Sequence, residues 1–504
     1  MRLRYGRAKA LNERHWLASP GFGPRLAAMR SLLSTLLALA LVASPIAPAA
    51  AQPAVQRQVE TGLAEAPAGT RFGLVVTDEA GRELVAINPD GRFVPASNTK
   101  LLTTAAAYVT LSGLEQPDAT GGATVRLVAG SGAAPDVVLT GNGDARLSSA
   151  ADCTANCLAA LADAVAARTR RVGNVIGDGR LFADDRWSPG MSWNNIHTRS
   201  GTGVAALSLD DNELVLRVSP GAVGETARLE APSYYRAVSR VMTVPAGQRT
   251  NVDFTRLPGS ADLVVTGVIE SGVEPVTLRL GIDDPAHYAA WALRAMLEAR
   301  GVAVSGAVSA THRSAAEASP ALSADPLARL TPAPLAEDIV RINKDSQNLH
   351  AELLLRRIGL ARGDGSIAGG VAGVEAMMAQ AGAARTGWDL SDGSGMSTYN
   401  RVSPRAMIAL LNWAARQPWG AAWRNSFPIG GVDGTLRSRF RGTALEGKIF
   451  AKTGTINAAN GLSGYLIAAS GRRLTFAFFA NDMPGGASAT ARMDAALLAI
   501  AAAN

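Results

Sequence analysis

The chain reads Pro95-Ala96-Ser97-Asn98-Thr99-Lys100 at the start of a predicted helix, which continues through the apolar residues 101–107. Ser97 and Lys100 stand three residues apart, so the hydroxyl and the amine face the same side of the helix. The N-terminal end of a helix also favours negative charge that develops nearby. A neutral Lys100 would take the proton of Ser97 while the serine attacks a carbonyl group. The alternative is an ordinary solvated serine and lysine, so this pattern needs support from the rest of the chain.

Lysine is rare in this chain, and its positions are therefore informative. Lysine and arginine together make up 49 residues, but only five are lysines, at positions 9, 100, 344, 448 and 452. Arginine serves wherever a positive charge alone is needed. A guanidinium does not give up its proton in a protein, whereas a buried amine does. The few lysines are thus candidates for proton transfer, and Lys100 and Lys452 both lie in recognisable patterns.

Two further patterns follow along the chain. Lys452-Thr453-Gly454-Thr455 lies on a predicted strand, where Gly454 lets a substrate backbone approach closely. The lysine and the two hydroxyls there suit a carboxylate or the reacting amide. Ser346-Gln347-Asn348 lies between two predicted helices and offers a hydroxyl and an amide, although serine and asparagine are both common in loops. The informative feature is the set S-x-x-K, S-x-N and K-T-G in this order.

Both ends of the chain have the pattern of a sheet with helices, whereas the middle differs. A hairpin is predicted at 72–87, strands at 449–455, 462–469 and 474–480, and helices at 284–302, 335–344 and 491–503. Residues 113–282 are rich in glycine and have a strand-like residue pattern. We expect one domain made of residues 52–112 and 283–504, split by an insertion of residues 113–282 that forms two domains. Three domains in series would leave the first with about 60 residues and a poor core.

The basic character of the chain is concentrated near its N-terminus. The formal net charge is +7 and the pI about 9.7, but residues 1–51 hold seven lysine and arginine residues against one acidic residue. An apolar run at 32–42 and the stretch Ala49-Ala50-Ala51 complete the pattern of a cleaved signal peptide. Met29 is the expected start, with residues 1–28 an over-called extension. The alternative, an uncleaved anchor, is disfavoured because a membrane span needs about 20 apolar residues.

The remaining chain is nearly neutral, which argues against a nucleic-acid partner. We expect an exported protein of the periplasm or cell envelope, without a stable transmembrane anchor. Cys153 and Cys157 precede a helical pattern, and a local disulfide is their expected use in an oxidising compartment. The chain has five histidines and no H-E-x-x-H sequence, so no metal or other cofactor is expected.

The patterns around Ser97, Ser346 and Lys452 resemble those of the penicillin-recognising serine enzymes. Within them, the sequence is similar to the class C low-molecular-mass group, the D-alanyl-D-alanine carboxypeptidases and endopeptidases of penicillin-binding protein 4 type. Further family-like segments are Gly141–Asp144, Leu207–Asn212, Asp392–Ser397 and Gly431–Leu436. A departure is Ala145-Arg146, where the family usually has Pro-Thr, and it puts the shape of that loop in doubt.

The resemblance implies an α+β fold, with a β-lactamase/transpeptidase-like domain split by a strand-rich insertion in two parts. That domain has an antiparallel sheet flanked by helices. The implied activity is that of a serine-type D-Ala-D-Ala carboxypeptidase, a DD-endopeptidase, or both. Such an enzyme acts on peptidoglycan stem peptides through an acyl-enzyme and is inhibited covalently by β-lactam antibiotics.

The resemblance also assigns roles to the matched residues. Ser97 is the nucleophile and Lys100 its base, while Ser346 relays a proton to the leaving amine and Asn348 orients the substrate and Lys100. Lys452, Thr453 and Thr455 hold the substrate carboxylate, with Gly454 leaving room for the peptide. The backbone N–H groups of Ser97 and Thr455 form the oxyanion hole. Lys344 and residues 392–397 are expected near the cleft as support, and His350 is expected to have a packing role.

Three other interpretations stay open at this point. A catalytically idle envelope protein would bind penicillin without releasing D-alanine. An exported scaffold with chance motifs would do neither. A simple serine β-lactamase is disfavoured, because that class lacks an insertion as long as the 249 positions that separate Ser97 from Ser346.

Overall fold

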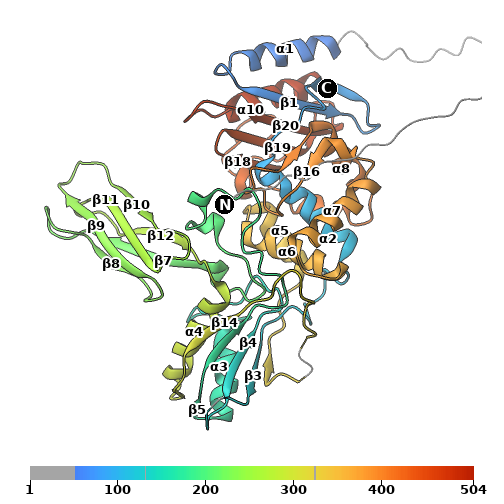
Figure 1. Cartoon of the computed structure of the whole chain (residues 1–504). Helices are drawn as coiled ribbons and strands as arrows, with labels where there is room; N and C mark the ends of the chain where they lie inside the picture. Colours follow the sequence, from blue (N-terminus) through green and yellow to red (C-terminus); the bar gives the residue numbers. More distant parts are fainter. Residues whose placement is uncertain (1–51, 131, 323–324) are drawn as a thin grey trace, which may run out of the picture. The chain divides into compact units, whose positions relative to one another are not determined.

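The structure is a computed structural model that describes residues 52–130, 132–322 and 325–504 of the chain (Figure 1). The predicted signal peptide, residues 1–51, lies outside the described residues. Among the residues that the structure describes, no helix is both long enough and apolar enough to cross a lipid bilayer.

Strands from the two ends of the chain form one antiparallel sheet with the order β18-β19-β20-β1-β2. Its strands are β1 (Arg71–Thr77), β2 (Glu83–Ile87), β18 (Ile449–Ile456), β19 (Ala459–Ile467) and β20 (Arg473–Asn481). The central strand is β20, and β1 runs beside it although the two are distant in sequence (Figure 1). The predicted hairpin and the three predicted C-terminal strands are confirmed.

Helices cover both faces of this terminal sheet, which explains why its inner strands are buried along nearly their whole length. Side chains alternate between the two faces of a strand. Leu74 and Val76 of β1 face a core built with α1 (Gln52–Ala64) and α10 (Thr490–Ala503), whereas Val75 faces the other core. The second core contains side chains of the helix that follows β2 and of the helices that follow the inserted region in the chain.

Those helices carry the segments that sequence analysis singled out. They are α2 (Thr99–Thr110), α5 (Leu335–Lys344), α6 (Asn348–Arg362), α7 (Ile367–Gln380), α8 (Pro404–Ala414) and α9 (Gly420–Asn425). Local sequence fixes several of their starts. The Ser403 hydroxyl accepts a hydrogen bond from the Ala406 N–H at 3.2 Å, and Pro404 occupies the first turn, where a missing N–H costs nothing. The helices predicted after Pro95 and at 335–344 are confirmed.

The inserted region contains a second five-stranded sheet with the order β14-β6-β4-β3-β15. Its elements are β3 (Thr124–Val128), β4 (Asp136–Thr140), α3 (Leu158–Arg168), β6 (Val175–Asp178), α4 (Pro285–Ala299), β14 (Val308–Thr311) and β15 (Ala328–Arg329). Two short strands, β5 (Arg171–Val172) and β13 (Ala303–Val304), pair with each other. Cys153 and Cys157 are joined by a disulfide directly before α3.

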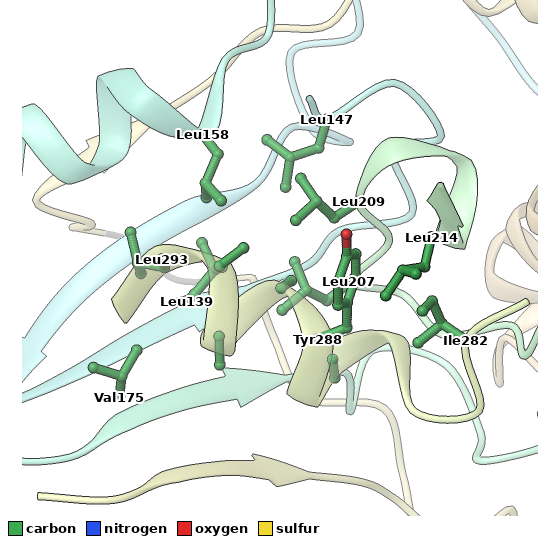
Figure 2. Close-up of a cluster of buried hydrophobic side chains, with 14 of the residues drawn as sticks. Leu139, Leu147, Leu158, Val175, Leu207, Leu209, Leu214, Ile282, Tyr288 and Leu293 are labelled. Carbon is green, nitrogen blue, oxygen red and sulfur yellow. The ribbon is translucent and has the colours of Figure 1, made fainter. Parts of the chain in front are cut away.

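Two three-stranded sheets lie between β6 and α4 in the chain, with the orders β12-β7-β8 and β10-β11-β9. Their strands are β7 (Glu213–Ser219), β8 (Arg228–Glu230), β9 (Arg236–Val244), β10 (Asn251–Thr255), β11 (Asp262–Glu270) and β12 (Val276–Gly281). Figure 2 shows part of the core that they share with the second sheet: Leu214 and Ile282 lie near Leu207, Leu209 and Tyr288. One continuous apolar cluster therefore runs through the inserted region.

The point where the chain leaves the inserted region differs from the expected boundary at residue 283. α4 contributes Tyr288 and Leu293 to the core of the inserted region (Figure 2). Farther along, β14 pairs with β6 and β15 pairs with β3. A boundary at 283 would therefore cut a sheet and its covering helix. We propose instead that the inserted region ends after Arg329, just before the proline-rich approach to α5.

Candidate active site

Ser97 lies in η1 (Ala96–Asn98), a 3-10 turn that leads directly into α2. Its neighbours Ala96 and Asn98 are buried, whereas Ser97 itself is partly exposed. Two glycines let other segments press closely against this turn. A Cβ atom on Gly395 would lie 1.9 Å from the Ala96 carbonyl oxygen, and one on Gly454 would lie 2.6 Å from the Pro95 carbonyl oxygen. Only glycine therefore permits this approach at either position.

The Lys100 amine is fully buried one turn along from Ser97. Its Nζ lies 2.9 Å from the Ser97 Oγ, 2.7 Å from the Asn348 Oδ1 and 2.6 Å from the carbonyl oxygen of Ser394. Burial lowers the pKa of Lys100 to about 7, against the opposing charges of Asp392 and Glu352. An amine with such a pKa is partly neutral at neutral pH and is able to accept the proton of Ser97.

Two buried carboxylates hold the segment that contacts Lys100. Glu352 accepts hydrogen bonds from the backbone N–H groups of Gly393 and Ser394, at 3.0 and 2.8 Å. Asp392 accepts from the N–H groups of Gly395 and Ser397, at 2.9 and 2.6 Å. Burial and the neighbouring Glu352 raise the pKa of Asp392 to about 6. The predicted supporting segment 392–397 is thus placed at the site.

Glu352 is not among the site residues that the sequence predicts. A signal was available, because Glu352 follows Asn348 by four residues on α6 and so shares its helix face. A buried carboxylate at that spacing from a site residue is a candidate partner for a buried amine.

Lys452 is also fully buried, on β18. Its Nζ donates to the Ser346 Oγ at 2.9 Å and to the Thr453 carbonyl oxygen at 3.0 Å. Burial holds the pKa of Lys452 well below its usual range, and the nearby charge of Lys100 acts in the same direction. Ser346 adopts a left-handed backbone conformation, with φ of 61°, in the turn between α5 and α6. The S-x-N and K-T-G patterns therefore meet through one hydrogen bond.

The structure brings all eight predicted site residues into this neighbourhood. Ser97 and Lys100 come from the start of α2, Ser346 and Asn348 from the α5–α6 turn, and residues 452–455 from β18. The arrangement offers a hydroxyl nucleophile beside a lysine of lowered pKa. A second hydroxyl next to a second lysine provides a route for a proton. Cys153 and Cys157 are not part of the site.

Lys344, expected as a supporting residue, forms an ion pair with Asp433 at 2.5 Å. Asp433 belongs to the family-like segment 431–436, which passes close to β18 because the hydroxyls of Thr435 and Thr453 lie 2.7 Å apart. Lys344 thus connects α5 with the loop beside Thr453.

His350 differs from the expected packing residue. It is buried, but both ring nitrogens lie 3.0 Å from carboxylates, Nδ1 from Asp338 and Nε2 from Asp211. Burial alone would lower the pKa of His350, but the two carboxylates outweigh it and hold the pKa above its usual value. The reason for the difference is that Asp211 comes from the inserted region, which a pattern in the α6 sequence does not reveal.

A polar cavity of about 530 Å³ opens beside the S-x-N turn. It is lined by Arg199, Ser200, Glu213, Arg341, Asp345, Ser346, Gln347 and Asn348. The Asn348 Nδ2 donates to the Ser200 carbonyl oxygen at 2.9 Å. Residues of the inserted region therefore form one wall next to the proposed reaction centre.

Comparison with known families matches residues 55–503 to the D-Ala-D-Ala carboxypeptidase 3 (S13) family. The D-alanyl-D-alanine carboxypeptidase of Actinomadura sp. (strain R39) is 34% identical over 441 residues, which cover 83% of this chain and 79% of that protein.

Solved structures show the same fold. Penicillin binding protein 4 from Haemophilus influenzae superposes with a TM-score of 0.74 at 20% identity, covering 88% of this chain and 97% of that chain. A structure of the same protein complexed with a β-lactam gives a TM-score of 0.68, with the same coverage and identity. The predicted fold class, an α+β transpeptidase-like domain with strand-rich additions, is confirmed.

Proposed function

Because the chain belongs to the D-Ala-D-Ala carboxypeptidase 3 (S13) family, we propose a role for each residue of its site. The enzyme is a serine D-Ala-D-Ala carboxypeptidase that β-lactams inhibit, as the sequence predicts. The observation that carries the assignment of roles is the 2.9 Å separation between the buried Lys100 amine and the Ser97 hydroxyl.

Acylation begins when the neutral Lys100 amine takes the proton of the Ser97 hydroxyl. The serine oxygen bonds to the carbonyl carbon of the D-Ala-D-Ala peptide bond, and the carbonyl oxygen becomes negatively charged. The backbone N–H groups of Ser97 and Thr455 receive this charge, and such a donor is typically worth about 3 to 4 kcal/mol. Support comes from β18, whose backbone at Gly454 runs close to the backbone N of Ser97.

Collapse of this intermediate breaks the C–N bond and releases D-alanine. The leaving nitrogen needs a proton, and Ser346 supplies it; the hydrogen-bonded Lys452 passes a replacement to Ser346 and takes one up from solvent in turn. The hydrogen bond between Lys452 and the Ser346 hydroxyl supports this route. Asn348 orients Lys100 through its side-chain oxygen. Lys452, Thr453 and Thr455 hold the C-terminal carboxylate of the substrate.

Water then hydrolyses the ester: Lys100, which has by then released the proton of Ser97 to solvent, takes a proton from the attacking water and gives it to the departing Ser97 oxygen. With a β-lactam, ring opening leaves the departing nitrogen tethered to the acyl group, so the ester persists. The partners are accordingly peptidoglycan stem peptides as substrates and β-lactams as covalent inhibitors. We infer export to the periplasm or cell envelope from this substrate, and the disulfide at Cys153 and Cys157 agrees with an oxidising compartment.

Release of D-alanine from an N-acylated peptide that ends in D-Ala-D-Ala tests the proposal. Wild-type protein should release it, whereas Ser97→Ala should release none and Lys100→Arg should lose at least a hundredfold, since general bases are worth roughly 10²–10⁴-fold. Lys448→Arg is the matched control, because it is the same substitution at an exposed lysine. Labelling by penicillin without D-alanine release would favour the idle envelope protein, and activity of Ser97→Ala would sink the assignment.

A further inference from the structure

Thr435 lies beside the site without a role in the proposed mechanism. It belongs to η6 (Gly434–Leu436) and is half-buried. Its hydroxyl lies 2.7 Å from the hydroxyl of Thr453, one of the residues proposed to hold the substrate carboxylate. Two hydroxyls at that separation share a hydrogen bond. Thr435 therefore acts directly on the group that meets the substrate.

The position of Thr435 is fixed from the helical side of the site. Asp433 pairs with Lys344 at 2.5 Å through one oxygen, and its other oxygen accepts the Ile429 N–H at 2.8 Å. Gly434 has a positive φ of 54°, and a Cβ atom there would lie 2.7 Å from the Lys344 carbonyl oxygen. The loop is thus seated on the end of α5, two residues before Ser346. A flexible surface loop would not hold a hydroxyl in one place.

When an anion is bound, the number of available protons fixes which of the two hydroxyls donates in the hydrogen bond between Thr435 and Thr453. A threonine hydroxyl has one proton to donate, and a carboxylate only accepts. When Thr453 donates its proton to a carboxylate, its oxygen remains an acceptor for Thr435. Thr435 must then be the donor in the pair. A chain from Thr435 to Thr453 to the carboxylate is strengthened because each hydrogen bond polarises the next.

We propose that Thr435 is a positioning residue that aims the Thr453 hydroxyl at the C-terminal carboxylate of the substrate. It thereby contributes to selectivity for peptides that end in a free carboxylate. This inference rests on the proposed function, because it takes Thr453 as part of the carboxylate site. Thr435 does not touch the reacting atoms and has no part in the transfer of the Ser97 proton.

The test compares two substrates that differ only at the C-terminus, an N-acyl-D-Ala-D-Ala with a free carboxylate and the same peptide as its C-terminal amide. In Thr435→Val, kcat/KM for the free acid should fall about tenfold, the usual scale for a lost hydrogen bond to a charged group. The amide should change much less, because it lacks the anion. Thr435→Ser keeps the donor and should restore the wild-type ratio of the two rates. Thr61→Val, on the exposed side of α1, is the control.

Labelling of Ser97 by a fluorescent penicillin, carried to completion, shows whether each variant is folded and able to form the acyl-enzyme. If Thr435→Val does not label, Thr435→Ala replaces it in the comparison. Equal losses on both substrates, or no loss on either, in a variant that labels fully would overturn the inference and leave the proposed function intact. A wild-type protein that neither labels nor releases D-alanine would instead contradict the proposed function.

Discussion

Lys100 and Lys452 are both fully buried, yet their amines have different neighbours. Lys100 feels two carboxylates, Asp392 and Glu352, which partly oppose the effect of burial on its pKa. For Lys452, the nearby charge of Lys100 adds to the effect of burial. With a pKa lowered to about 7, Lys100 changes protonation near neutral pH. This difference suits Lys100 to act as the base that activates Ser97.

The rate of acylation by penicillin should fall as the pH is lowered through about 7, because only the neutral Lys100 accepts the Ser97 proton. The measurement is the second-order rate constant of labelling across the neutral range. Lys100→Arg should lose roughly 10²–10⁴-fold at every pH and show no such limb, since a guanidinium stays protonated. A Lys100→Arg protein within a few-fold of the wild type would rule out Lys100 as the base.

Glu352→Gln should shift this acidic limb toward lower pH. Glu352 raises the pKa of Lys100, so loss of its charge leaves the amine neutral in more acidic solution. The maximal rate should also fall, roughly tenfold, because the Ser394 carbonyl that contacts Lys100 is less well held. A lower rate with an unmoved limb would mean that Glu352 acts only on the backbone of residues 393–394.

At the scale of elements, the site depends on how closely β18 approaches the η1 turn. Gly454→Ala would place a Cβ atom 2.6 Å from the Pro95 carbonyl oxygen and 2.8 Å from the Asn98 Nδ2. We expect a loss of about 1–3 kcal/mol in the free energy of unfolding, typical of overpacking, together with much slower penicillin labelling. Urea unfolding and labelling rates measure the two effects.

Gly62→Ala is the matched control for Gly454→Ala, because nothing lies within 4 Å of its added Cβ atom on α1. It should label like the wild type and gain up to about 1 kcal/mol from helix propensity. If Gly454→Ala also labels at the wild-type rate, the close contact between β18 and η1 is not needed for acylation.

Elements with a strong apolar pattern could be predicted from the sequence, and elements defined by distant partners could not. The hairpin of β1 and β2 and the strand β20 have long apolar runs between turn residues. In contrast, β15 has only two residues and exists because β3 lies beside it. The apolar face of α4 is equally compatible with either five-stranded sheet, which is why the sequence alone predicts an earlier end of the inserted region than the one that we propose.

The residues of the site divide in the same way. Ser97, Lys100 and the residues of the S-x-N and K-T-G patterns are recognisable because their spacing along the chain is itself the signal. Glu352 and Thr435 act through contacts between segments that are distant in sequence. The spacing of Glu352 from Asn348 points to it only once Asn348 is taken as a site residue. Thr435 is a common residue type, and no pattern marks its position before the fold is known.

At the scale of the whole molecule, charged groups join the inserted region to α5 and α6. His350 of α6 lies between Asp338 of α5 and Asp211 of the inserted region. Arg146 of the inserted region pairs with Asp338 at 2.7 Å, and Arg341 pairs with Asp211 at 2.5 Å. His350 lies two residues after Asn348, so this cluster connects the inserted region to the wall of the site.

The cluster should make the stability of the protein depend on pH. The folded-state pKa of His350 is raised above its unfolded value of about 6.5. The contribution of charged His350 to the free energy of unfolding is fully present below that unfolded pKa, and it is lost as the pH rises through the folded pKa. The destabilisation caused by His350→Gln should therefore be larger at about pH 6 than at about pH 9. Urea unfolding at both pH values measures it, and an equal effect at both would contradict a charged His350.

The central claim is that Ser97 forms the acyl-enzyme, and mapping of the covalent adduct tests it most directly. Wild-type protein is incubated with a fluorescent penicillin and digested, and the labelled peptide is identified by mass spectrometry. We predict one adduct per chain, on the Ser97 hydroxyl, and none in Ser97→Ala. An absence of label on the wild type, or a label on another residue such as Ser346, would contradict the account.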